Sequence, residues 1–298
     1  MLPTAPPRSI DPSPHPLVTG SAPAWASAWG EDRFGVFAAF SLGDLVQRPR
    51  WIPAGVFRMG SPEDEPGRDS DEGPQHVVQI GRGFWLFDTP CTQALWTRVM
   101  GKNPSRFQSP DRPVERVSWD DVQRFLATIN GERPGLELVL PTEAQWEHAC
   151  RAGTGEALYQ GPIEILGLNN APALDRIAWY GGNSGVGFDL AEGEDSSRWP
   201  EMQHPSARSG THPVAGKESN SWGLFDMLGN VWEWCADGNR TYDARWEPDP
   251  VGPLDVGGVR VVRGGSWLNF ARFCRCAYRR RLAPDDRDAD LGFRCAQS

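Results

Sequence analysis

The chain has 298 residues, 39% of them hydrophobic, and a formal net charge of -9. This length supports a sizeable core, and the negative charge disfavours nucleic-acid binding through a general phosphate-contact surface. The 33 Gly, 27 Pro and 14 Trp residues favour turns and loops anchored by large side chains over long helices. No apolar stretch is long enough to cross a bilayer, so no membrane span is expected.

Residues 1–21 are rich in Pro and Ser, which predicts a flexible leader before a single domain at residues 22–298. The N-terminus lacks a basic segment followed by an apolar run, so no signal peptide is predicted and the default location is cytoplasmic. Surface display by an unrecognised route stays open.

The first predicted strand is Phe34-Gly-Val-Phe-Ala-Ala-Phe-Ser-Leu42, and the motif Trp51-Ile-Pro-Ala-Gly-Val-Phe-Arg-Met-Gly-Ser61 follows it. Residues 62–72 then form an acidic loop. Its carboxylates are compatible with a cation site, but loops of this composition are more commonly solvated, and we expect a solvated loop.

Three helices are predicted next, the first over residues 92–99. The second, residues 118–130, has Ser118 as its N-cap and a buried stripe at helical spacing. The third, residues 141–153, begins with a capping box from Thr142 to Gln145 and ends at Gly153. On it we expect Trp146 to be a packing anchor. Residues 154–215 have the weakest pattern and predict an irregular, exposed loop region that could flank a binding surface.

The motif Trp222-Gly-Leu-Phe-Asp-Met-Leu-Gly-Asn-Val-Trp-Glu-Trp234 places two carboxylates, Asp226 and Glu233, on either side of a sharp turn at Gly229-Asn230. Carboxylates and carbonyls across a turn suit a hard cation such as calcium. The alternative is a turn whose carboxylates cap backbone amides. Both interpretations stay open at this point.

The C-terminal stretch begins with a β-branched run from Arg260 and turns at Gly264-Gly265. Residues 276–282 predict an extended segment, with Tyr278, Arg280 and Leu282 on one face and Ala277, Arg279 and Arg281 on the other. Residues 284–288 predict a turn, and residues 291–295 a short closing strand. From pattern alone this is either a hairpin with solvated charges or a functional surface.

The run Arg263-Gly-Gly-Ser-Trp267, with Cys274, Arg279, Pro284-Asp285 and Gly292-Phe-Arg294, resembles the C-terminal signature of formylglycine-generating-enzyme-like domains. Residues 51–61, 178–184, 212–217 and 222–234 resemble motifs of the same family. The resemblance covers about residues 50–296. It implies an α+β fold of the C-type lectin type, with short strands, few helices and much irregular loop.

The C-terminal stretch is closer still to the variable proteins of diversity-generating retroelements, in which adenine-directed copying diversifies fixed asparagine codons. This resemblance implies a non-catalytic ligand-binding protein with a hypervariable region at about residues 260–298, whose partner is a protein or other macromolecule. Matched residue by residue, the diversified positions are Leu268, Asn269, Phe270, Phe273, Cys276, Tyr278, Arg280, Leu282, Asp286, Asp288, Ala289 and Asp290. The intervening Arg272, Cys274, Arg275, Arg279, Arg287 and Gly292 would be scaffold.

The genetic code allows a check on these twelve mapped positions. Changing only the adenines of an asparagine codon keeps its third-position pyrimidine, so Lys, Glu, Gln, Met and Trp cannot arise. None of the mapped positions holds one of these five residues.

Family resemblance also implies a structural calcium site, formed by the side chains of Asp226 and Glu233 and the carbonyls of Gly229 and Val231. Of the six cysteines, Cys91 and Cys150 lie within apolar patterns and predict buried thiols. The family analogy would pair Cys150 with Cys276.

The formylglycine-generating enzyme uses two cysteines that hold a copper ion, and their positions match Cys274 and Asn269 here. An amide cannot replace a thiolate as a soft-metal ligand, so no copper and no copper oxidase chemistry are expected. The alternative function is an oxidoreductase of this superfamily working by another route, or an inactive subunit of such an enzyme.

Overall fold

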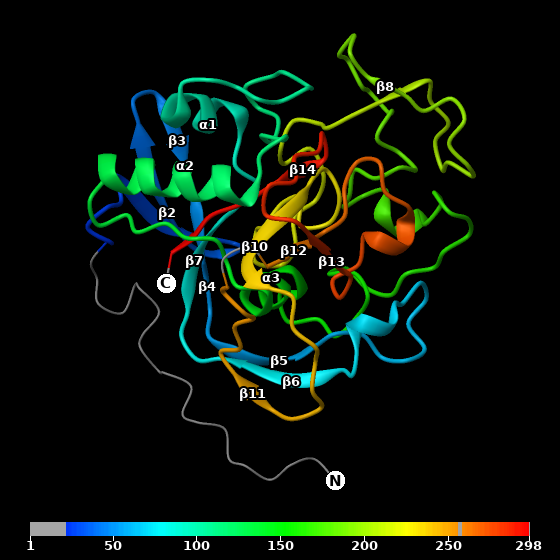
Figure 1. Cartoon of the computed structure of the whole chain (residues 1–298), viewed down its shortest axis with the longest axis horizontal. Helices are drawn as coiled ribbons and strands as arrows, with labels where there is room; N and C mark the ends of the chain where they lie inside the picture. The colour runs from blue at the N-terminus through cyan, green and yellow to red at the C-terminus, as the bar shows by residue number, and fades with distance from the viewer. Residues whose placement is uncertain (1–21, 256–257, 298) are drawn as a thin grey trace.

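The computed structural model describes residues 22–255 and 258–297. The predicted leader, residues 1–21, lies outside the described residues. Across the described residues the fold is α+β, with small sheets, three α-helices and long connecting loops (Figure 1). None of the described helices is long and apolar enough to cross a membrane.

The largest sheet joins the two ends of the domain. It has six strands in the order β1-β2-β4-β7-β15, with β3 paired to β2. The bounds are Ala28–Asp32 for β1, Gly35–Leu42 for β2, Leu45–Gln47 for β3, Pro49–Ile52 for β4, Phe84–Phe87 for β7 and Ala296–Gln297 for β15. Strand β15 pairs antiparallel with β7, so the end of the chain closes onto its N-terminal third.

A second sheet carries the C-terminal stretch, in the order β13-β12-β10-β14. Its strands are β10 (Trp232–Gly238), β12 (Arg260–Arg263), β13 (Arg279–Leu282) and β14 (Leu291–Gly292). Smaller pairings complete the fold: β11 (Glu247–Pro248), β6 (His76–Ile80) and β5 (Gly55–Met59) form one sheet, and β8 (Glu194–Asp195) pairs with β9 (Arg208–Ser209).

The three predicted helices are present as α1 (Gln93–Met100), α2 (Trp119–Glu132) and α3 (Glu143–Arg151). Ser118 caps α2, and the capping box of Thr142 and Gln145 starts α3, as predicted. Their local signals are sufficient because a cap satisfies amides of the first turn without help from the rest of the fold. The buried stripe of α2 is Val122, Phe125, Leu126 and Ile129.

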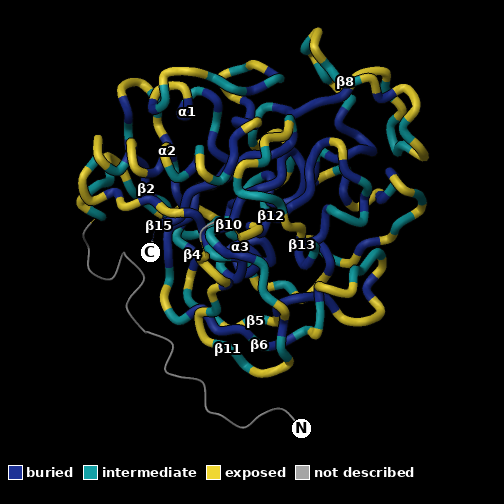
Figure 2. The backbone as a smooth tube through the Cα atoms, in the orientation of Figure 1, coloured by how far each residue is buried: buried dark blue, intermediate teal, exposed yellow. Residues whose placement is uncertain are grey.

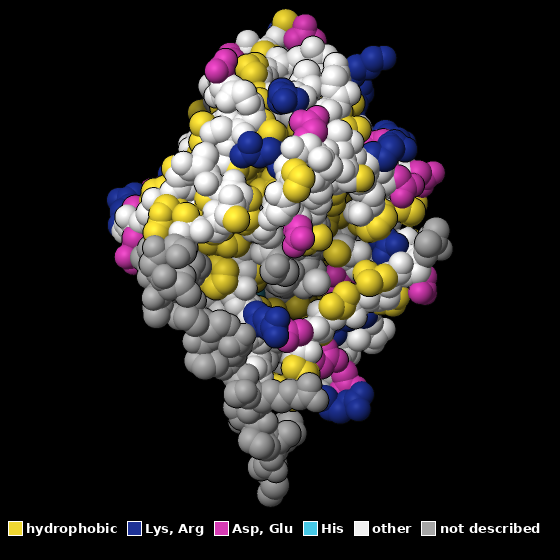
Figure 3. Space-filling model, turned by 90° about the vertical axis from the view of Figure 1, so that its left-hand side faces the viewer, with side chains coloured by type: hydrophobic (Ala, Val, Ile, Leu, Met, Phe, Trp, Pro, Cys, Tyr) yellow, Lys and Arg dark blue, Asp and Glu magenta, His cyan; other side chains and the backbone are white. Residues whose placement is uncertain are grey.

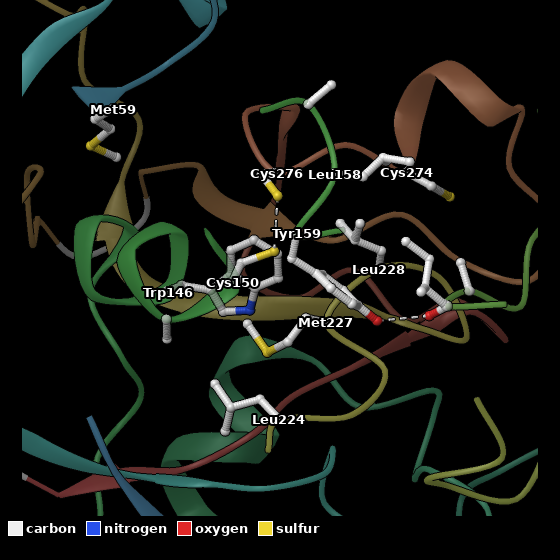
Figure 4. Close-up of a cluster of buried hydrophobic side chains, with 14 of the residues drawn as sticks. Met59, Trp146, Cys150, Leu158, Tyr159, Leu224, Met227, Leu228, Cys274 and Cys276 are labelled. Carbon is white, nitrogen blue, oxygen red and sulfur yellow. Dashed lines mark hydrogen bonds between the residues drawn. The ribbon is translucent and has the colours of Figure 1, made fainter. Parts of the chain in front are cut away.

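Two large clusters of buried side chains form the core. Figure 2 shows that the residues coloured as buried are concentrated in the middle of the molecule. One cluster surrounds α3 and includes Trp146, Cys150, Tyr159 and Met227 (Figure 4). The other packs α1 and α2 against the C-terminal end of the chain, where the ring of Phe293 meets that of Phe125 at 5.3 Å. Trp146 is fully buried and is the packing anchor that the sequence predicts.

Residues 154–215 are largely irregular, as predicted, with only β8, β9 and the 3-10 turn Pro172–Leu174 assigned among them. The expected exposure is wrong for part of this segment, since Tyr159, Ile177 and Tyr180 are buried in the core. The predicted extended segment at 276–282 is shorter, because a turn closed by the Tyr278 amide on the Arg275 carbonyl delays strand β13 to Arg279. Of the predicted closing strand at residues 291–295, only Leu291–Gly292 forms a strand, β14, and β15 follows beyond it at Ala296–Gln297.

The expectation of a solvated loop at residues 62–72 is wrong for two of its carboxylates. Glu65 and Glu72 are buried and bind Arg275 of the C-terminal stretch. Elsewhere the surface is mixed: on the face drawn in Figure 3, acidic and basic side chains alternate with apolar patches.

Candidate functional site

The C-terminal stretch is built on strand β12 and the turn that follows it. Gly264 and Gly265 have φ angles of 99° and 76°, which only glycine adopts without strain. A Cβ on Gly265 would also lie 2.6 Å from the sulfur of Cys274. The turn therefore needs glycine for conformation and for space, and it fixes the start of the loop that carries residues 266–278.

The twelve mapped positions separate into accessible and buried groups. Nine are exposed or half-buried: Leu268, Phe270, Phe273, Tyr278, Arg280, Leu282, Asp286, Asp288 and Ala289. The other three, Asn269, Cys276 and Asp290, are at most 7% exposed. In this conformation the accessible nine can contact a ligand, whereas the buried three can act only through the packing beneath them.

Aromatic rings form a continuous row among the accessible positions. The ring of Phe270 stacks on that of Phe273 at 6.0 Å, and Phe273 meets Tyr278 at 4.8 Å. Tyr278 in turn lies 5.9 Å from the buried ring of Trp232, over which the Arg280 guanidinium also sits. Aromatic side chains have few rotatable bonds and offer a large contact area at a low entropy cost, and Tyr is enriched in binding hot spots.

Ion pairs attach the residues next to this aromatic row to the loop at residues 62–72. Arg275 donates to the carboxylates of Glu65 and Glu72, and Arg272 donates to Asp69 at 2.7 Å. The side chains of Arg275 and Glu72 are fully buried, whereas those of Arg272 and Asp69 are 38% and 47% exposed. The loop at residues 62–72 is therefore a scaffold for the C-terminal stretch.

A second buried ion network joins β12 and β13 to helix α3. Arg263 binds Glu143 and Glu147, and Arg279 binds Glu143. Burial by itself raises the pKa of Glu147, but the guanidiniums of Arg151 and Arg263 outweigh it and hold this pKa below its usual value. The predicted scaffold role of Arg279 agrees with its place in this network, and the alternative of a hairpin with solvated charges does not hold for this residue.

A cleft of about 640 Å³ lies next to the aromatic row, to which Arg272 connects it: Arg272 lines the cleft, and its guanidinium lies 5.2 Å from the ring centroid of Phe273. The cleft is lined by Pro66, Gly67, residues 163–168, Glu201 and Arg272. The loop at 163–168 is bonded to the C-terminal stretch through the Ala271 amide, which donates to the Leu168 carbonyl at 2.9 Å. Sequence reasoning missed these lining residues, because no local pattern shows which loops meet in space.

The turn at Gly229-Asn230 has the sharp geometry predicted, with φ angles of 80° and 60°. The negative charge of Glu233 is already compensated. Each of its two oxygens accepts a hydrogen bond from Arg294 at 2.7 Å, and one of them also accepts from the Trp146 ring nitrogen at 2.7 Å. Asp226 accepts from the Ala215 amide at 2.7 Å, and among the described residues it has no ion-pair partner.

Burial raises the pKa of Asp226 to about 6. A buried carboxylate without a cation fits a calcium ligand, and a calcium ion at this turn would have to share Glu233 with Arg294. Across the described residues, the His, Cys, Asp and Glu side chains form no cluster of three or more suited to a metal. Carbonyls such as those of Gly229 and Val231 would therefore have to complete the site.

All six cysteines are buried free thiols, which confirms the prediction for Cys91 and Cys150. The sulfur atoms of Cys150 and Cys276 lie 3.6 Å apart (Figure 4). Cys274 is fully buried, and Asn269 lies beside Ser266, whose hydroxyl is 2.6 Å from the Asn269 side-chain oxygen.

The family model of the sulfatase-modifying factor enzyme 1-like domain matches residues 44–298. The chain belongs to this family. The formylglycine-generating enzyme of Thermomonospora curvata is 30% identical over 307 aligned positions, covering 82% of this chain and 91% of that enzyme. The bovine formylglycine-generating enzyme is 33% identical over 72% of this chain, which spans half of the bovine enzyme's length.

Among solved structures, this sulfatase-modifying factor enzyme 1-like domain is similar to Treponema denticola variable protein 1. The TM-score is 0.68 at 27% identity, and the match covers 88% of this chain and 98% of that one. These similarities confirm the family and fold that the C-terminal signature predicts. The match of Cys274 and Asn269 to the two cysteine positions of the formylglycine-generating enzyme stays a prediction from the sequence resemblance.

Proposed function

We propose that this protein is a non-catalytic ligand-binding protein whose C-terminal surface is diversified by a retroelement. The observation that carries the proposal is the alternation of accessible and buried side chains along residues 263–290. Accessible side chains of varied chemistry, such as Phe270, Tyr278 and Arg280, alternate with Arg275 and Arg279, which are buried in ion networks. Accessible positions on a scaffold anchored this way can change without loss of the fold.

The ligand surface would consist of the aromatic row Phe270, Phe273 and Tyr278, with the adjacent cleft beside it. The cleft has a volume of about 640 Å³, which accommodates a protruding segment of a protein or other macromolecule. The similarity to a protein named as a variable protein supports this function. We also propose that Asp226 contributes to a structural calcium site.

The test is deep sequencing of codons 260–298 in a population of the source cells, with a search of the neighbouring DNA for a near-copy of this stretch. We expect substitutions concentrated at the mapped positions and adenines at the corresponding sites of the copy. A uniform sequence without a neighbouring copy would overturn the diversification.

The alternative is an oxidoreductase of this family, favoured by the 30% identity with the Thermomonospora enzyme and by the retained Cys274. Incubating the purified protein with copper(I) and a cysteine-containing peptide separates the two functions. We expect neither stoichiometric copper binding nor peptide oxidation, because Asn269 supplies an amide in place of the second thiolate. Stoichiometric copper binding together with oxidation of the peptide would establish the enzyme instead.

A further inference from the structure

A second cavity, of about 460 Å³, lies between helix α2 and the chain that follows it. Its apolar wall includes Leu126 and Ala127 of α2 and Leu138 and Leu140 of the next segment. None of the twelve mapped positions lines this cavity, and it shares no lining residue with the cleft of about 640 Å³, so it is separate from the proposed ligand surface. Its volume falls within the range of small-molecule sites.

One of the lining residues, Arg260, is a buried cation without a carboxylate. The described residues include eight buried arginines, and seven of them form salt bridges with Asp or Glu. Arg260 is the exception. It is 3% exposed, and its Nη atoms donate to backbone carbonyls, the shortest bond being 2.8 Å to Asp255.

The Arg260 guanidinium packs against an aromatic ring that is itself hydrogen-bonded. The guanidinium lies 4.3 Å from the ring centroid of Trp119, and the ring nitrogen of Trp119 donates to the Cys235 carbonyl at 3.0 Å. The Nε atom of Arg260 is buried without a hydrogen-bond partner. Carbonyl dipoles and a ring face stabilise a buried guanidinium less than a paired anion does, so an anion beside this cation would be stabilised.

We propose that this cavity binds a small apolar carboxylate. The apolar part of the ligand packs against Leu126, Leu138 and Leu140, and its carboxylate faces Arg260. An aliphatic acid satisfies both features of the cavity, since its chain buries apolar surface and its single charge compensates the single unpaired cation.

The test is calorimetric titration of the full chain with decanoate and with decanol, which has the same chain length and no charge. We expect decanoate to bind at least tenfold more tightly than decanol, because only the acid can pair with Arg260. Equal affinities would overturn the proposal, and so would a lack of decanoate binding.

Two variants locate the binding. Ala127→Phe places a ring at the cavity wall and should weaken decanoate binding at least tenfold. Thr128→Phe is the matched control, because the neighbouring residue is also exposed but does not line the cavity, and it should bind decanoate like the parent chain. If both variants bind decanoate equally well, the cavity is not the site.

Arg260→Gln tests the charge, with circular dichroism used to establish that the variant is folded. We expect the tenfold preference for decanoate over decanol to disappear. A preference that persists in the folded variant would overturn the role of Arg260, and if the variant does not fold, the Ala127 and Thr128 pair decides.

Discussion

Arg275 donates to both oxygens of Glu72, with one bond at 2.8 Å, although 203 positions separate the two residues in the sequence. This ion pair attaches the C-terminal stretch, which carries the twelve mapped positions, to the loop at residues 62–72. Burial of both partners makes it sensitive to removal of either, because the remaining charge would be left buried and unpaired.

Replacing Glu72 with Gln should lower the free energy of unfolding by about 3–5 kcal/mol, the usual effect of breaking a buried ion pair. Urea unfolding at neutral pH measures it. Asp69→Asn is the matched control, since the Asp69–Arg272 pair is partly exposed and should contribute no more than about 1 kcal/mol. A similar effect of both changes would contradict the anchoring role of Glu72.

The mapped positions should tolerate the same new residue unequally. Arg280 lies on the exposed side of β13, so Arg280→Asn should change the free energy of unfolding by no more than about 0.5 kcal/mol. Cys276→Asn places an amide in a fully buried site and should destabilise by about 1–3 kcal/mol. Thermal unfolding of the two variants compares them, and equal stability would show that Cys276 is more accessible than its burial indicates.

Calcium should stabilise the protein through Asp226. A saturating concentration, about 100-fold above Kd, would add about 2.7 kcal/mol to the free energy of unfolding. Melting temperature with calcium and with a chelator is the measurement, and Asp226→Asn should reduce the difference. The same melting temperature in both conditions would count against an occupied structural site.

Asp290 predicts a dependence of stability on pH. Burial raises its pKa to about 6, while the hydrogen bond with Ser266 opposes the shift. The folded state therefore binds the proton more tightly than the unfolded state, whose carboxyl titrates near the ordinary value of 3.8. This contribution to stability falls as pH rises from about 4 to 6 and stays low above it.

Asp290→Asn removes this titration. The difference in free energy of unfolding between the variant and the parent chain should shift in favour of the variant as pH rises from about 3.5 to 7.5. The shift should be roughly 3 kcal/mol at most, because the pKa changes by about two units and each unit corresponds to 1.36 kcal/mol. Urea unfolding of both proteins at the two pH values measures it. A difference that does not change with pH would show that Asp290 titrates normally.

Mild oxidation should join Cys150 and Cys276, because their sulfur atoms lie 3.6 Å apart in the core. Thiol titration under denaturing conditions should then find four thiols in place of six, and five in Cys150→Ala with or without oxidant. Six thiols after oxidation of the parent chain would rule out the pairing that the family analogy predicts.

The sequence by itself determined the features that depend on neighbouring residues. Ser118 and Thr142 satisfy amides only three positions away, and the glycines at 264 and 265 permit their turn through their own backbone conformation. The signature around Arg263 to Gly292 likewise indicated the family, because it is read directly from residue identities.

The family resemblance predicted Arg275 as scaffold, but only the tertiary structure showed that Glu65 and Glu72 are its partners. The acidic loop has the composition of a solvated segment, and Arg275 that of an exposed cation. Their burial depends on contacts between distant segments, which local composition does not encode. The same holds for Arg260: only the structure shows that the other seven buried arginines of the described residues pair with a carboxylate and that Arg260 does not.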